Sequence, residues 1–194
     1  GKKVILLGGD HSTPLGYMQA LAQKYDSFGI LQIDAHADLR QAYEGFEFSH
    51  ASIMFNALKM TQLTSLVQVG VRDICKEEID LIQADKRIRT YFDVKLHQER
   101  FRGVSVSEQW DSIIKDLPEQ VYVSFDIDGL DPKLCPNTGT PVPGGLQYAE
   151  VVELFRRLKE SGKQIIGCDL NEVGNQEWDA NVGARILYEL SCIL

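Results

Sequence analysis

Apolar residues cluster in five short runs that are nearly continuous and rich in valine, isoleucine and leucine. Such runs are typical of strands buried on both faces of a parallel sheet, because no alternate position has to face water. We therefore predict strands over Val4–Leu7, Phe28–Ile33, Leu66–Val71, Val121–Phe125 and Gln164–Cys168.

Between these runs, apolar residues recur every three or four positions, which is the period of an amphipathic helix. We expect Ser12 or Thr13 to cap the first helix, because both precede Pro14 and proline suits the first helical turn. The alternation of strands and helices predicts a layered α/β domain. The predicted helices are Pro14–Tyr25, Ser49–Met60, Lys76–Gln83, Ser107–Lys115, Gln147–Lys159 and Asp179–Ile193.

The composition limits the partners of the protein. With 194 residues, 44% of them hydrophobic, residues 1–194 can form one domain with a substantial core. A formal net charge of -8 argues against nucleic acid as a partner and favours small cationic ligands. No apolar run approaches the roughly 18 residues of a membrane span, so we expect no membrane partner. The four cysteines form no C-x-x-C pair, which predicts reduced thiols and a cytoplasmic location.

Two connecting segments differ in the role that their composition predicts. The segment Asp131–Gly145 is rich in proline and glycine and is long enough to predict a functional loop. We expect Glu99–Val106 to be an ordinary surface connection and His97 to be a surface residue.

Polar residues follow the ends of four predicted strands. In an extended chain alternate residues point to the same side, so Asp34, His36 and Asp38 can converge. Ligands of an open parallel sheet gather outside the carboxyl ends of its strands. We therefore expect one shared site, to which the other strand ends contribute Asp10, His11, Asp126, Asp128, Asp169 and Glu172.

This set of residues predicts a metal centre. A single aspartate after a strand is usually a helix cap or a turn former, but several carboxylates crowded together repel unless a cation neutralises them. Carboxylates with a few imidazoles and no thiolate suit Mn²⁺, with Zn²⁺, Co²⁺ or Fe²⁺ as alternatives. Four aspartates and two histidines are enough for two ions bridged by carboxylates, and such a pair lowers the pKa of a shared water.

Three segments resemble the metal motifs of the ureohydrolases, the family of arginase, agmatinase and formimidoylglutamase. They are Gly8–Ser12 (GGDHS), Asp34–Asp38 (DAHAD) and Ser124–Pro132 (SFDIDGLDP), in the family's order and with its internal spacing. The resemblance implies a three-layer α/β/α fold with a mostly parallel sheet. It also implies two Mn²⁺ per subunit and a homo-oligomer, either a trimer or a hexamer.

The resemblance also assigns roles to individual residues. It implies that Asp34 and Asp126 bridge the two ions, that His50 shuttles protons, and that Glu172 holds the substrate's guanidinium. We expect Asp38 to be a catalytic residue as well as a metal ligand. We expect Asp10 either to orient His11 or to cap the next turn. The implied ligands are His11, Asp34, Asp38 and Asp126 for one ion and Asp34, His36, Asp126 and Asp128 for the other.

Within the family, this chain looks most similar to agmatinase. Leu39 and Arg40 stand where arginases carry an asparagine for the amino-acid head group. The expected reaction is hydrolysis of agmatine to putrescine and urea. Arginase, guanidinobutyrase and formimidoylglutamase activities stay open, because Arg40 suits an acidic substrate and Gly174–Trp178 departs from the usual agmatinase segment.

Other interpretations remain. A two-metal phosphoesterase would need an additional Asn-His pair on a later strand, and a single-zinc amide hydrolase of the deacetylase type would not need Asp128 as a ligand. His11 lies close to the start of the chain, so we expect that N-terminal elements of the family are missing. A truncated or degenerate scaffold that only binds metal is therefore a further alternative.

Overall fold

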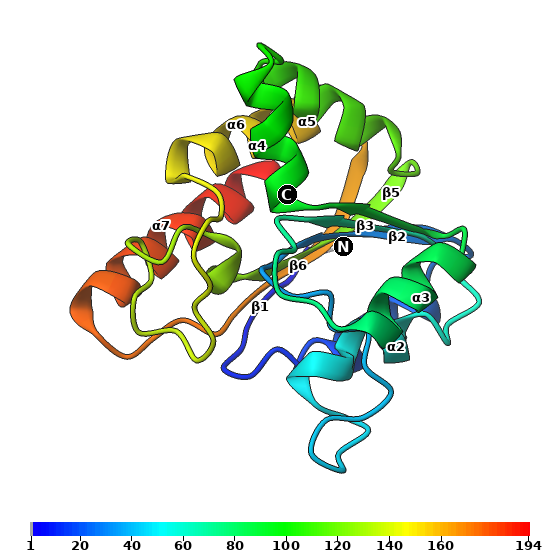
Figure 1. The fold of residues 1–194 in the computed structure, drawn as a ribbon. Helices are drawn as coiled ribbons and strands as arrows, with labels where there is room; N and C mark the ends of the chain where they lie inside the picture. The colour runs from blue at the N-terminus through cyan, green and yellow to red at the C-terminus, as the bar shows by residue number, and fades with distance from the viewer. Residues whose placement is uncertain (1) are drawn as a thin grey trace.

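The computed structural model describes residues 2–194, and across them the backbone forms a six-stranded sheet in the order β1-β6-β5-β2-β3-β4 (Figure 1). Every neighbouring pair in this sheet is parallel. The strands are β1 (Ile5–Leu7), β2 (Phe28–Ile33), β3 (Leu63–Val69), β4 (Ile88–Tyr91), β5 (Gln120–Asp126) and β6 (Gln164–Asn171).

Helices cover both faces of the sheet. The helices α1, α2 and α3 pack on one face through one buried cluster, and α4 to α7 pack on the other face through a second cluster (Figure 1). The predicted three-layer α/β/α fold is therefore confirmed. The α-helices are α1 (Leu15–Ala22), α2 (Ile53–Ala57), α3 (Lys76–Ala84), α4 (Asp93–Phe101), α5 (Val106–Lys115), α6 (Tyr148–Glu160) and α7 (Glu177–Ile193), with short 3-10 helices at His50–Ser52 and Ile127–Gly129.

The five predicted strands are present, with ends shifted by a few residues. Four of them are buried over most of their length as expected, whereas β1, at an edge of the sheet, is partly exposed. All six residues of β2 are buried, and so are six of the seven in β5. The predicted helix Ser49–Met60 is broken into the 3-10 turn His50–Ser52 and the short helix α2.

Two elements were missed. The strand β4 lies at an edge of the sheet and only one of its four residues is buried, so its sequence has no apolar run. Leu96 is the one apolar residue that the helix α4 buries, so this helix lacks the broad apolar face of the other helices. The expectation that Glu99–Val106 is a connection was wrong at its start, since α4 continues to Phe101.

The predicted cap of the first helix was also wrong. Pro14 occupies the N-cap position of α1, and no side chain caps the helix there. The hydroxyl of Thr13 donates to the carbonyl oxygen of Asp10, and the amide of Ser12 donates to the carboxylate of Asp10. Ser12 and Thr13 therefore stabilise the turn before the helix rather than the helix itself.

The strand order creates a crevice at the centre of the sheet. From β2 the chain proceeds outward through β3 to β4, and it then returns to place β5 on the other side of β2. The connections after β2 and β5 therefore leave in opposite directions, and this is where open α/β sheets bind ligands.

Two further observations concern the hydropathy of the helices and the cysteines. Among residues 2–194, no helix is both long and apolar enough to cross a bilayer. Cys75, Cys135, Cys168 and Cys192 carry free thiols.

Replacing Phe155 by alanine is expected to lower the free energy of unfolding by about 3–5 kcal/mol, because a large cavity would open between α6 and β5. Phe155 is 1% exposed, and its ring packs edge-on against Phe125 with centroids 6.0 Å apart. Urea denaturation measures the change. Tyr188→Ala is the control, since Tyr188 is 67% exposed on α7; a loss for Phe155→Ala no greater than that of the control would contradict the predicted packing.

Candidate metal centre

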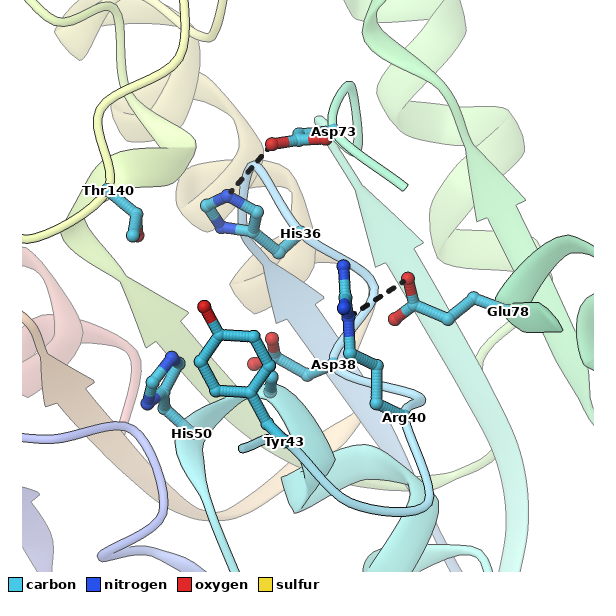
Figure 2. A pocket seen from close by; sticks show the side chains of 9 residues that line it. His36, Asp38, Arg40, Tyr43, His50, Asp73, Glu78 and Thr140 are labelled. Atoms are coloured by element: carbon cyan, nitrogen blue, oxygen red, sulfur yellow. Dashed lines mark ion pairs between the residues drawn. The ribbon is translucent and has the colours of Figure 1, made fainter. Parts of the chain in front are cut away.

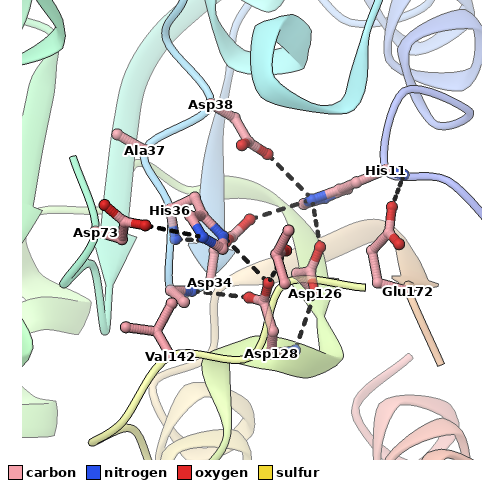
Figure 3. A network of polar contacts seen from close by, with 12 residues as sticks. His11, Asp34, His36, Ala37, Asp38, Asp73, Asp126, Asp128, Val142 and Glu172 are labelled. Carbon is pink, nitrogen blue, oxygen red and sulfur yellow. Dashed lines mark hydrogen bonds and ion pairs between the residues drawn. The ribbon is translucent and has the colours of Figure 1, made fainter. Parts of the chain in front are cut away.

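The connections after β2 and β5 bring four aspartates together in the central crevice. Asp34 and Asp38 follow β2, Asp126 ends β5, and Asp128 lies in the 3-10 turn after it. All four are buried, with at most 5% of each residue exposed. Figure 3 shows that they surround the imidazoles of the two histidines predicted beside them. The structure thus brings together all six predicted ligands.

Backbone amides hold one oxygen of three of these carboxylates. The amide of His36 donates to Asp34 Oδ1 at 2.7 Å, that of Ala35 to Asp128 Oδ1 at 3.0 Å, and that of Asp128 to Asp126 Oδ1 at 2.9 Å. The second oxygen of each carboxylate faces a histidine. The backbone therefore fixes how the carboxylates are turned before any ligand binds.

A glycine permits the two connections to approach each other. A Cβ atom on Gly129 would lie 2.8 Å from the backbone nitrogen of Asp34 and 3.0 Å from the carbonyl carbon of Ile33. A larger residue there would push the turn after β5 away from the end of β2 and separate the carboxylates.

The first group of candidate ligands surrounds His11, which is fully buried. Its Nδ1 lies 3.1 Å from Asp34 Oδ2, 3.2 Å from Asp38 Oδ2 and 3.1 Å from Asp126 Oδ2. Among the described residues this nitrogen has no well-directed hydrogen bond. Adjacent ligands of an octahedral ion with bonds of about 2.1–2.2 Å lie about 3.0–3.1 Å apart. The four atoms therefore suit a cation between them better than a hydrogen bond.

The second group surrounds His36. Its Nδ1 lies 3.1 Å from Asp128 Oδ2 and 3.5 Å from Asp34 Oδ1. In each group, His11 with Asp34 and Asp38 or His36 with Asp34 and Asp128, one ligand atom from each residue lies within 4.8 Å of the others. Asp34 belongs to both groups, as a bridging carboxylate must. Oxygen with a minority of imidazole nitrogen is a donor set for Mn²⁺ and similar divalent ions.

The electrostatics of the site also favour cations. Burial opposes protonation of His11, but the three carboxylates around Nδ1 outweigh it and raise its pKa well above the ordinary value. Burial would likewise lower the pKa of His36, but Asp128 and Asp34 raise it to about 11. Burial and the charge of Asp34 raise the pKa of Asp38 to about 8. The site thus concentrates negative charge that protons or metal ions have to balance.

A serine and a further aspartate support His11 from behind. The Nε2 of His11 lies 3.0 Å from the hydroxyl of Ser124, which donates to Asp169 Oδ1 at 3.1 Å. These contacts hold Nε2 as the protonated nitrogen and leave Nδ1 for the carboxylate cluster. The role of Ser124 was missed by sequence reasoning, although it is the polar residue within the apolar run VYVSF.

Glu172 and His50 lie beside the carboxylate cluster and line a cavity of about 150 Å³ together with Asp10. Glu172 Oε1 accepts a hydrogen bond from the backbone amide of His11 at 2.8 Å, and burial raises the pKa of this carboxyl. Glu172 has a φ of +61°, an uncommon conformation that turns its side chain toward His11. His50 Nδ1 lies 3.4 Å from Asp10 Oδ2. Asp10 therefore contacts His50 and the turn after it, rather than orienting His11.

An outer pocket opens next to this cavity (Figure 2). Glu78 is buried there and accepts hydrogen bonds from the backbone amides of Leu39 and Cys75. Arg40 lies with its Nε 3.9 Å from Glu78 Oε2. Sequence reasoning missed Asp73 and Glu78 in this pocket, because they lie on the connection after β3 and on α3, far along the chain from the predicted ligands. The lining includes Arg40, Tyr43, His50, Asp73, Glu78 and Thr140.

Arg72 anchors the predicted functional loop Asp131–Gly145 to the site. Its guanidinium donates to the carbonyl oxygens of Gly70, Asp128, Leu130 and Val142 at 2.7–3.2 Å. A planar fork of five donors can join three chain segments in this way. The loop after β5 is thereby held against the ends of β3 and β5.

The remaining histidine lies elsewhere. His97 is on α4, with its Nε2 3.5 Å from Asp93 Oδ1 and its ring stacked against Phe101. It is partly exposed and takes no part in the cluster, as expected.

Comparison with known proteins gives a consistent result. A model of the arginase family matches residues 1–192. An N(1)-aminopropylagmatine ureohydrolase of Thermus thermophilus is 36% identical over 190 residues, which cover 97% of this chain and 61% of that protein. A guanidinobutyrase of Pseudomonas aeruginosa is 32% identical, with 98% of this chain and 60% of that protein covered. The chain thus spans about three fifths of the length of these relatives.

A solved structure extends the comparison to the fold. The agmatine ureohydrolase of Thermoplasma volcanium superimposes with a TM-score of 0.80 and 26% identity, covering 100% of this chain and 62% of that one. The shared part therefore includes the whole sheet and both connections that carry the aspartates.

Adding Mn²⁺ to the chelator-treated protein is expected to raise its Tm, because an ion that binds only the folded state stabilises it by about 2.7 kcal/mol at a hundredfold excess over its Kd. Differential scanning fluorimetry measures the shift. Asp34→Asn removes the carboxylate that is common to both groups and should abolish most of it. An equal shift in the wild type and the variant would count against this site.

Proposed function

The chain belongs to the arginase family, and on that premise we propose that it is a metal-dependent hydrolase that cleaves a guanidino compound into urea and an amine. One observation carries the proposal. Two groups of aspartate and histidine share Asp34 in the crevice of the sheet. A single-ion centre of the deacetylase type would require only one of these two groups.

The six residues that would hold the ions are His11, Asp34, His36, Asp38, Asp126 and Asp128, with Asp34 and Asp126 as the bridging carboxylates. We propose Mn²⁺, two per subunit, because the donor set is rich in oxygen. Such a pair lowers the pKa of a shared water and supplies a nucleophile at neutral pH.

Glu172 would hold the substrate in place. Its Oε1 accepts a hydrogen bond from the amide of His11, while Oε2 lies near Gly139. A carboxylate in this position matches the planar fork of a guanidinium. Holding the guanidinium at Glu172 would leave its carbon facing the aspartate cluster.

His50 would transfer protons during the reaction. Hydrolysis transfers the oxygen of water to the guanidinium carbon and breaks the bond from that carbon to the alkyl nitrogen, and both hydrogens of the water go to that nitrogen, which leaves as an ammonium group. His50 is 39% exposed on the cavity wall and pairs with Asp10, so it can exchange protons with solvent and with the departing amine. Asp38, also proposed as catalytic, would act through its position beside His11.

Agmatine is the proposed substrate, hydrolysed to putrescine and urea. The outer pocket holds Asp73 and Glu78, and the one cation among the lining residues other than histidine, Arg40, lies beside Glu78. A tail that ends in an amine is therefore favoured there over a tail that ends in a carboxylate. The homo-oligomer and the cytoplasmic location expected from the sequence stay predictions.

Asp126→Asn is expected to lower urea release from agmatine by at least about 100-fold, because it removes a proposed bridging ligand without changing the size of the side chain. A colorimetric urea assay with Mn²⁺ measures the rate. Asp26→Asn is the matched control. Asp26 is exposed and precedes β2, so it lies at the amino end of this strand, away from the aspartate cluster at the carboxyl end. Unchanged turnover in Asp126→Asn would discard the proposed role.

The substrate can be tested separately with a panel of agmatine, arginine, guanidinobutyrate and formimidoylglutamate. We expect the highest kcat/KM with agmatine, because its tail carries a positive charge and no carboxylate. A preference for guanidinobutyrate or formimidoylglutamate would instead assign the tail to Arg40. No urea release from agmatine, arginine or guanidinobutyrate in the presence of Mn²⁺, and no turnover of formimidoylglutamate, would contradict the proposed reaction.

A further inference from the structure

A row of polar side chains crosses the sheet beneath the metal centre. Thr90 on β4 pairs in register with Gln68 on β3, and Gln68 pairs with Gln32 on β2. Gln32 and Gln68 are fully buried. The residues two positions earlier in the three strands are Ile30, Leu66 and Ile88, which belong to the apolar cluster under α1, α2 and α3. The polar row thus follows an apolar layer on the same face of the sheet.

The hydrogen bonds of this row run in one direction and end at the metal centre. The hydroxyl of Thr90 donates to Gln68 Oε1 at 2.7 Å, Gln68 Nε2 donates to Gln32 Oε1 at 2.6 Å, and Gln32 Nε2 donates to Asp34 Oδ2 at 2.8 Å. Every donor points toward Asp34, which is the carboxylate shared by both ligand groups.

The same amides also hold the backbone that carries the ligands. Gln68 Nε2 donates to the carbonyl oxygen of Ala37 at 2.7 Å, and Gln32 Nε2 approaches that of His36 at 3.4 Å. The next residue, Asp38, has a φ of +55°, which is uncommon for a residue other than glycine. The two glutamines therefore hold the segment in which the chain turns sharply between its ligands.

Stability alone does not account for two buried amides here. A pair of buried hydrogen-bonded groups is often no more stable than apolar side chains of the same shape. The arrangement does have a consequence at Asp34. Its Oδ1 accepts from the amide of His36 and its Oδ2 from Gln32, so the plane of the carboxylate is fixed with one donor on each oxygen.

We propose that Gln68 and Gln32 are positioning residues that orient Asp34 as the carboxylate bridging the two ions, and that Thr90 orients Gln68 in turn. The inference rests on the metal centre of the proposed function, but not on the identity of the substrate. It extends the machinery of the site across three strands, to the edge strand β4.

Gln68→Leu tests the proposal, because leucine fills the space but cannot donate to Gln32 or to Ala37. Isothermal titration of the chelator-treated protein with Mn²⁺ should show affinity reduced by about 10–100-fold, the usual effect of losing a partner that orients a ligand. The kcat for urea release should fall with affinity, while the KM for agmatine at saturating Mn²⁺ should change little.

Gln109→Leu is the matched control for a purely structural effect. Gln109 is also buried and donates to the carbonyl oxygen of Leu96, but it lies on α5, on the other side of the sheet. Both variants should lower the Tm of the metal-free protein to a similar extent, and Gln109→Leu should keep wild-type affinity for Mn²⁺. Equal affinity in Gln68→Leu and the wild type, or an equal loss in both variants, would overturn the proposal.

Thr90→Val provides a milder test if Gln68→Leu does not fold, since it removes one hydroxyl at nearly constant volume. It should weaken Mn²⁺ binding by about 2–5-fold, less than the loss of an amide that contacts the ligand segment directly; unchanged affinity would remove Thr90 from the row. The outcomes separate the two proposals. A wild type that binds no Mn²⁺ refutes the metal centre and this inference together, whereas wild-type binding that survives the substitutions refutes this inference alone.

Discussion

The mutual repulsion of four buried carboxylates is the constraint on which the rest of this structure depends. Asp34, Asp38, Asp126 and Asp128 share a crevice that excludes most water, so their charges are poorly screened. Protonation within the cluster itself relieves part of the repulsion, as the raised pKa of Asp38 indicates. Divalent ions would relieve it more completely, and their binding energy would then contribute to the stability of the fold.

The fold sustains this crowding by fixing the carboxylates from several directions. The carboxyl ends of the parallel strands lie on the same side of the sheet. The connections after β2 and β5 leave in opposite directions there and open the crevice. Backbone amides hold three of the aspartates, and Arg72 joins the loop after β5 to the end of β3. The site is therefore preorganised by rigid elements, which is the condition for a precise metal centre.

The candidate metal centre and the outer pocket share His36 and Asp38, and the pocket adds residues from farther along the chain. It adds Arg40 and Tyr43 from the connection after β2, Asp73 from the connection after β3, and Glu78 from α3. One relative is named for aminopropylagmatine and the other for guanidinobutyrate. Both compounds contain a guanidino group, but its tail is an aminopropyl-extended amine in the first and ends in a carboxylate in the second. Under the proposed function, the centre would take the common group and the outer pocket the variable tail, since loops can change without disturbing the sheet.

The sequence by itself determined the strands with continuous apolar runs, the amphipathic helices, and the aspartates and histidines at the strand ends, since each of these depends on spacing within one segment. Tertiary structure alone decided that Gln32, Gln68 and Thr90 form one row, that Ser124 supports His11, and that Glu78 and Asp73 join Arg40 in the outer pocket. It also decided the edge strand β4 and the helix α4, whose sequences bury too few apolar residues to stand out. The physical reason is that periodicity records which side of its own element a residue faces, whereas its partner depends on strand order and register, which only the packing of the whole chain sets.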